Sequence, residues 1–173
     1  MGYINVKRRY LLRESERKEF LRGLSENLGI NYKDFFGFKP KVEVIDVSEG
    51  KIFAVDDKPV LMEFKGEIIP TLAFEGLLRQ LPKVTVDMGA VPHICNGADI
   101  MAPGIVRIEG EFKEGDIVLV LDEKHGKAIA VTKALLGSRE AKNLKSGKVL
   151  KNLHYVGDAF WRVMTDIFQK RKG

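Results

Sequence analysis

The apolar positions in the first half of the chain change period several times, and each period predicts a different element. Residues 4–12 alternate apolar and polar side chains and predict an opening strand. Residues 13–29 carry apolar side chains at helical spacing and end at Gly29, so they predict a helix with the stripe Phe20, Leu21, Leu24 and Leu28. Four short apolar runs separated by turn residues then predict an antiparallel meander at residues 41–47, 51–55, 59–64 and 67–70. Residues 71–81 predict a second helix with Thr71 as its N-cap.

The pattern changes at Leu81-Pro82, where a second series of short strands begins. Strands are predicted at residues 83–89, 105–110, 116–122, 127–137 and 149–156, with short helices at residues 90–97 and 138–147. Residues 160–169 have helical spacing, but Gly157-Asp158 also suits a hairpin turn followed by a strand. The pattern therefore does not decide whether residues 158–168 form a helix or a strand, although it favours the helix. We predict an α+β fold in two domains, residues 1–81 and residues 82–173.

Length and composition narrow the class of protein. The chain has 173 residues, enough for one domain or two small ones, and its apolar runs are too short to span a membrane. The first twenty residues lack the apolar core of a secretory signal. Cys95 is the only cysteine, so no internal disulfide can form, which suits a reducing compartment. We expect a cytoplasmic protein with no membrane partner.

Positive charge is concentrated in two places. The formal net charge is +5, and from Lys124 to Lys151 eight basic residues stand against Glu140 alone. A second basic cluster, Lys7, Arg8 and Arg9, lies near the start, and the pattern leaves its role open. A solvated surface explains an isolated run of lysines, whereas two clusters and a basic chain favour a polyanionic partner such as nucleic acid.

Side chains that would support catalysis or hold a metal are scarce. His93 stands two residues before Cys95, and residues two apart on a helix face different ways. The remaining histidines, His125 and His154, are scattered, and one cysteine with three histidines does not make a metal site. The glycine-rich run of residues 89–104 matches no nucleotide-binding loop. We predict no catalysis, no metal and no cofactor.

The stretch Val86–Ile105, VDMGAVPHICNGADIMAPGI, is almost neutral in a chain that is 31% charged. Gly89 and Gly97 bracket a short helix, and Pro103-Gly104 predicts a tight turn into the next strand. Glycine at these points either permits a positive φ or lets a partner approach the backbone closely. The residues themselves leave both uses open.

This stretch resembles the first strand, helix and loop of a PUA domain, the RNA-binding module named after pseudouridine synthases and archaeosine transglycosylases. The segments IIPTL (Ile68–Leu72), GADIMAPGI (Gly97–Ile105) and NLHYVGDAFW (Asn152–Trp161) are similar to the malignant-T-cell-amplified-sequence family and its archaeal relatives. The resemblance covers nearly the whole chain. It implies an N-terminal α+β pre-PUA module followed by a mostly antiparallel β pseudobarrel with short helices.

The resemblance also implies a function and a binding face. It implies a non-catalytic RNA-binding protein that binds tRNA, at its acceptor end, or rRNA in translation initiation, reinitiation or ribosome recycling. The small ribosomal subunit and a translation-initiation-factor-like protein are the implied partners. The RNA-binding face carried over from the family is Asn96, Gly97, Ala98, Asp99, Met101, Ala102, Pro103 and Gly104. Electrostatics adds Lys127, Lys133, Lys148 and Lys151, because the strands after the loop should return near it.

Several alternatives stay open. Asp99 is either an RNA contact or an acceptor that braces the loop through backbone N–H groups. The glycines serve structural turns as readily as ligand contacts, and Tyr155 and Trp161 belong in a small core as readily as against a base. At the level of function, the alternatives are an RNA-targeting subunit of a separate RNA-modifying enzyme, or a protein-docking module that binds RNA incidentally.

Overall fold

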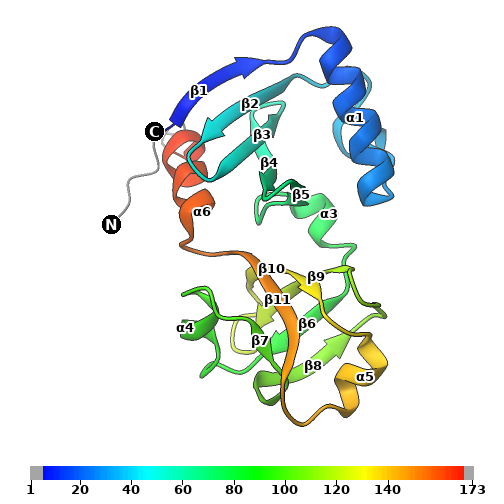
Figure 1. The fold of residues 1–173 in the computed structure, drawn as a ribbon, viewed down its shortest axis with the longest axis vertical. Helices are drawn as coiled ribbons and strands as arrows, with labels where there is room; N and C mark the ends of the chain where they lie inside the picture. The colour runs from blue at the N-terminus through cyan, green and yellow to red at the C-terminus, as the bar shows by residue number, and fades with distance from the viewer. Residues whose placement is uncertain (1–5, 170–173) are drawn as a thin grey trace. The chain divides into compact units, whose positions relative to one another are not determined.

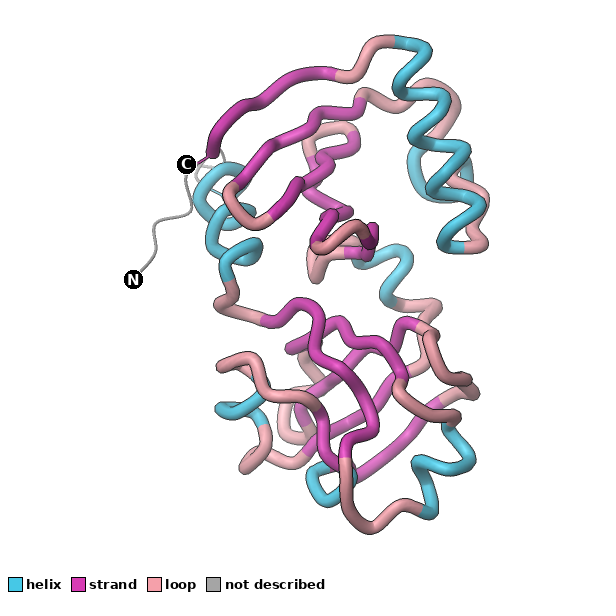
Figure 2. Tube along the Cα trace, in the orientation of Figure 1, coloured by secondary structure: helices cyan, strands magenta, loops and turns pink. Residues whose placement is uncertain are grey.

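The computed structural model describes residues 6–169, which form two compact units. The first contains residues 6–77 and 162–169, and the second contains residues 78–161. Figure 1 traces the chain through both units, and Figure 2 shows that each of them contains both strands and helices. The predicted α+β class is confirmed. The predicted domain limits, residues 1–81 and 82–173, stay a prediction.

The first unit contains an antiparallel meander of five strands. They are paired in chain order as β1 (Val6–Leu11), β2 (Val42–Val47), β3 (Gly50–Val55), β4 (Lys58–Phe64) and β5 (Glu67–Pro70). The register aligns Ile45, Ile52, Met62 and Ile69 in one row across four strands, and all four are at most 4% exposed. Cross-strand apolar rows of this kind fix the register, because a slip by one residue would bring polar side chains inward. The predicted strands are confirmed.

Helices of the first unit pack apolar side chains against this sheet. α1 (Glu14–Leu28) ends at Gly29, whose φ of 63° is the left-handed conformation that glycine adopts easily. Leu24 of α1 joins Val44, Phe53 and Leu61 in the core. α2 (Lys33–Phe36) is a short helix that the apolar pattern missed. Its two phenylalanines are held against the same core by the ring of Phe74.

The predicted helix of residues 71–81 is shorter than expected. α3 spans only Glu75–Leu78. Thr71 does not cap it, because this fully buried side chain donates its hydroxyl to Pro59 O (2.6 Å) and accepts the N–H of Ala73 (3.1 Å). A turn that satisfies these buried groups replaces the first helical turn.

The open question about the C-terminal segment is resolved as a helix. α6 spans Ala159–Met164, and a π-helical turn, η2, continues over Thr165–Gln169. Asp158 starts the helix by accepting the N–H of Trp161 (2.8 Å). The same carboxylate accepts the N–H of Tyr155 (3.0 Å) and contacts Nδ1 of the buried His154 (2.8 Å). The hairpin alternative is therefore wrong.

The second unit is a single sheet of six strands that curls into a half-barrel. Its spatial order is β7 (Ile100–Met101), β11 (Lys148–Tyr155), β10 (Ala128–Ala134), β9 (Ile117–Asp122), β6 (Lys83–Val86) and β8 (Ile105–Glu109). All pairs are antiparallel except β6 with β9. The edge strands β7 and β8 are joined by only three residues, the 3-10 turn η1 (Ala102–Gly104). Because these edges stand at opposite ends of the strand order, so short a link requires the sheet to curl round.

Two short helices, α4 (Val91–Ile94) and α5 (Ser138–Asn143), complete the second unit. Ile94 of α4 and Ala141 of α5 are buried in the same core as Val84, Val120 and Leu150. Across the described residues, no helix is both long enough and apolar enough to cross a membrane. The turn η1, which links β7 to β8, thus lies where the two edges of the curled sheet meet (Figure 1).

Candidate nucleic-acid interface

The segment from α4 to β7 is a tight loop that closes the short helix. The N–H groups of Asn96 and Ala98 donate to His93 O, and the N–H of Gly97 donates to Ile94 O (3.0 Å). Gly97 has a φ of +97°, and a Cβ at this position would lie 3.3 Å from the hydroxyl of Tyr155. Both the backbone conformation and the close ring therefore favour glycine here. Gly97 therefore has a structural role in the loop. Residues 96–98 of this loop are exposed.

Asn152 and Asp99 hold this loop against strand β11. The side-chain amide of Asn152 donates to Ile94 O and to Ala98 O, each at 3.0 Å. In return, the backbone N–H of Asn152 donates to Asp99 Oδ1 (2.9 Å). Asp99 therefore braces the loop, which is one of its two predicted roles. The motif NLHYVGDAFW contains Asn152, but the sequence does not indicate this role, because Asn152 stands 53 residues from its loop partner Asp99.

Strand pairing brings most of the predicted basic and apolar contacts together. Lys148 of β11 pairs with Met101 of β7, and Lys133 of β10 pairs with Lys151 of β11. Lys148 Nζ also lies 3.2 Å from Asp99 Oδ2, so the carboxylate neutralises part of its charge. Met101 is 43% exposed, a large fraction for an apolar side chain, and its strand partner is Lys148. The α4–β7 loop, β7 and the start of β11 form one surface, which we call the seam surface.

The predicted RNA-binding residues differ in their exposure and in their distance from the seam surface. Asn96, Gly97, Ala98 and Pro103 are exposed, whereas Gly104 is half-buried. Ala102 is only 9% exposed and packs in the core. Lys127 lies at the far end of β10, where Asp122 accepts its backbone N–H (3.2 Å). Six residues along a strand separate it from Lys133, about 20 Å in extended chain.

Two residues of the N-terminal basic cluster, Arg8 and Arg9, are paired within their own unit. Arg9 contacts Glu43 (2.7 Å) and lies over the ring of Phe168. Arg8 contacts Asp46 (3.3 Å) and lies over the ring of Tyr10. These arginines thus bind neighbouring carboxylates and rings of the first unit. Their positive charge is largely compensated where they stand.

The side chains tested for catalysis or metal binding remain apart. Burial raises the pKa of the Cys95 thiol, which disfavours the nucleophilic thiolate. His154 is fully buried and engaged with Asp158. Within residues 6–169, no three His, Cys, Asp or Glu side chains gather in a way that could hold a metal ion.

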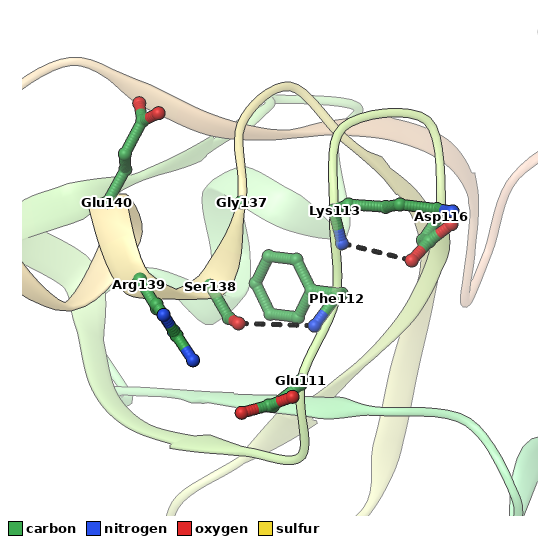
Figure 3. Close-up of a pocket in the computed structure, with 8 residues that line it drawn as sticks. All are labelled: Glu111, Phe112, Lys113, Asp116, Gly137, Ser138, Arg139 and Glu140. Atoms are coloured by element: carbon green, nitrogen blue, oxygen red, sulfur yellow. Dashed lines mark hydrogen bonds between the residues drawn. The ribbon is translucent and has the colours of Figure 1, made fainter.

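A separate hollow of about 390 Å³ lies between the β8–β9 loop and α5 (Figure 3). Ser138 Oγ accepts the N–H of Phe112 (3.2 Å), and Asp116 accepts the N–H of Lys113 (3.0 Å), so both polar groups serve the loop itself. The wall also carries Arg139 and carboxylates, which mix both signs of charge. None of the predicted RNA-binding residues lines this hollow.

Comparison with known proteins places the chain in a family. Residues 82–156 match the family described as "PUA domain", and residues 8–79 match the family described as "Domain of unknown function (DUF1947)". An uncharacterised protein of Methanocaldococcus jannaschii is 39% identical over 161 residues, which span 91% of this chain and 98% of that protein. The chain belongs to the family of PUA-domain proteins with this N-terminal domain. The resemblance inferred from the sequence is confirmed.

Two further relatives of this PUA-domain protein are informative. Translation machinery-associated protein 20 of Saccharomyces cerevisiae is 27% identical over 131 residues, covering 71% of this chain and 72% of the yeast protein. A crystal structure described as a PUA domain from Aeropyrum pernix, in complex with tartrate, superimposes with a TM-score of 0.76. It is 28% identical and covers 91% of this chain and 92% of that one. The predicted pseudobarrel fold is confirmed.

Proposed function

We propose that this PUA-domain protein is a non-catalytic RNA-binding protein of the translation machinery, and that it binds the acceptor end of tRNA, or rRNA, through the seam surface. The observation that carries the proposal is the pairing of Met101 with Lys148 and of Lys133 with Lys151 beside a fixed glycine loop. This proposal assigns the protein to the cytoplasm. It includes the small ribosomal subunit and a translation-initiation-factor-like protein as partners.

Each part of the seam surface suits a different part of an RNA strand. Lys148, Lys151 and Lys133 supply cations for phosphates. The exposed backbone of the Asn96–Ala98 loop and the thioether of Met101 suit the sugar and base edges of an unpaired end. Asn152 and Asp99 keep these groups in place before RNA arrives, so little ordering entropy is lost on binding.

Fluorescence anisotropy with deacylated tRNA, with and without its CCA end, tests the proposal across a salt series. We expect tighter binding to the tRNA that retains the CCA end. Binding should weaken linearly on a log–log plot of affinity against salt, with a slope that counts phosphate contacts. Equal, weak and salt-sensitive binding to both tRNAs would refute the acceptor-end assignment and direct the search to ribosomal RNA.

The double substitution Lys148→Glu and Lys151→Glu tests the surface itself. Loss of two phosphate contacts should reduce the slope of log affinity against log salt by about 1.8. Between 50 and 200 mM salt, the loss of affinity should therefore be about 12-fold smaller for the variant than for the wild type. The control is Lys113→Glu with Lys124→Glu, which changes the net charge equally at exposed positions in the β8–β9 and β9–β10 loops of the same unit, outside the seam surface. If both double variants bind alike, net charge alone explains the affinity and the seam surface is wrong.

A further inference from the structure

The loop that follows α2 in the first unit exposes a large aromatic side chain. Phe38 is 75% exposed, and it is the only exposed aromatic residue among residues 6–169. The next most exposed large apolar side chain of the described chain is Leu11, at 54%. Exposure of a phenyl ring to water is unfavourable. A surface that keeps such a ring exposed is a candidate for contact with a partner.

The backbone around Phe38 is fixed on both sides. Before it, Gly37 has φ 76° and ψ −163°, a region that only glycine adopts readily. After it, Pro40 is buried, the backbone N–H of Lys41 donates to Asp56 Oδ1 (2.9 Å), and the backbone N–H of Asp56 donates to Lys41 O (2.9 Å). The ring is thus presented by a defined loop between the core-packed helix α2 and the β3–β4 turn.

A lysine lies against this ring. Lys33 Nζ lies 5.5 Å from the centroid of the Phe38 ring, which is cation–π distance. Lys39 follows directly in the sequence and helps to lower the pKa of Glu14, after the larger effect of Lys18. The segment from Lys33 to Lys41 carries three lysines and Asp34, and Nζ of Lys41 is paired with Asp57 Oδ1 (3.1 Å). An exposed aromatic face beside lysines is the arrangement with which proteins bind unpaired nucleotides, the ring for the base and the cations for the phosphates.

We propose that Phe38, with Lys33 and Lys39, forms a second RNA contact, at which an unpaired base stacks on the ring. This contact lies in the N-terminal domain, outside the seam surface, and goes beyond the proposed function while sharing its ligand class. The lysine beside the ring favours RNA over an apolar protein partner, because such a partner carries no phosphate for Lys33 to bind. The contact has no sequence preference, because every base offers a π face.

The test uses the full chain and a fluorescein-labelled dodecamer of uridine, whose bases stack little on one another. Phe38→Ala should weaken binding of this probe about 10-fold, which is the effect of losing one base–aromatic stack. Phe38→Leu should weaken it nearly as much, whereas Phe38→Trp should retain wild-type affinity within 2-fold. Leu11→Ala is the matched control, since it removes an exposed apolar side chain of the same unit. Thermal melts should be unchanged, because Phe38 contributes little to the core.

Three results would overturn the inference: equal affinity for all four variants, wild-type affinity for Phe38→Leu, or weaker binding by Leu11→Ala than by Phe38→Ala. Wild-type affinity with leucine would indicate an apolar docking residue for a protein. The same series in the Lys148→Glu, Lys151→Glu background separates the two sites. A Phe38 effect that persists there supports this contact even if the seam surface fails, and its absence in both backgrounds refutes this contact even if tRNA binding depends on the two lysines.

Discussion

Substitution of Asn152 is the sharpest test of how the binding loop is held. Its side-chain amide is the donor to Ile94 O and Ala98 O, while its own Oδ1 is buried without a hydrogen-bond partner. Asn152→Ala removes two hydrogen bonds, each with a net value of about 1 kcal/mol. It also removes the unsatisfied Oδ1, and Ala98 O becomes free to bond water. The expected net loss in the free energy of unfolding is therefore about 1–2 kcal/mol.

Asn152→Asp should be worse than alanine, although it preserves the shape of the side chain. Above the pKa of the new carboxyl group, a carboxylate oxygen would face two carbonyl oxygens, beside Asp99. A buried charge without a donor costs more than a missing hydrogen bond, so we expect a loss of about 3 kcal/mol or more. Protonation of the new group restores one donor. The defect should therefore diminish as the pH falls.

Differential scanning calorimetry and hydrogen exchange measure these effects. A loss of 1–2 kcal/mol should lower the melting temperature by about 3–6 °C in a chain of this length. Exchange should accelerate at the amides of residues 96–98, which the loop hydrogen bonds protect. An aspartate variant that is more stable than the alanine variant at neutral pH would refute the donor role of Asn152.

Two further substitutions test the electrostatics of the second unit. Asp99→Asn removes the charge that faces Lys148 but keeps an oxygen for the N–H of Asn152, so RNA affinity should rise about 2- to 3-fold in anisotropy titrations; unchanged affinity would mean that Lys148 does not contact phosphate. The N–H of His125 holds the pKa of Asp122 below its ordinary value, with a smaller contribution from the N–H of Lys127. A lowered folded-state pKa stabilises the fold above the unfolded pKa, about 3.9, and this stabilisation is lost as the pH falls through the folded value. Asp122→Asn should therefore be less stable than wild type in urea at pH 7 and nearly equal to it at the acid end of the transition, whereas a constant difference at all pH values would contradict this origin.

Periodicity predicted the elements whose stability is local or whose apolar faces are simple. α1 was predicted from its stripe and its terminal glycine, and the four strands β2–β5 of the meander from their apolar runs and turns, whereas the pairing of β1 with β2 appears only in the structure. The helix at residues 71–81 was overestimated, because its pattern contains no sign that Thr71 bonds to Pro59. β7 is only two residues long and exists through its pairing with β11, so no period could reveal it.

The candidate site divides in the same way. The Gly97–Gly104 string is specific enough to indicate the PUA domain, and the basic run up to Lys151 indicated an anionic partner. The burial of Ala102 and the distance of Lys127 from the other lysines were not visible in the string. Ala102 is turned inward in η1, the short link between the two edges of the curled sheet, and Lys127 is separated from Lys133 by the length of β10.

The sequence by itself determined the fold class through its periodicity and indicated the family through its motifs, because apolar spacing and motifs are properties of neighbours along the chain. Only the tertiary structure decided that Asn152 holds the loop, that Asp99 pairs with Lys148, and that Arg8 and Arg9 are compensated by carboxylates. The two residues in each of these interactions are 34 to 58 positions apart in the sequence. Their energies depend on distances of about 3 Å, which are set when the sheets pair and the half-barrel curls, and no local pattern of side chains encodes them.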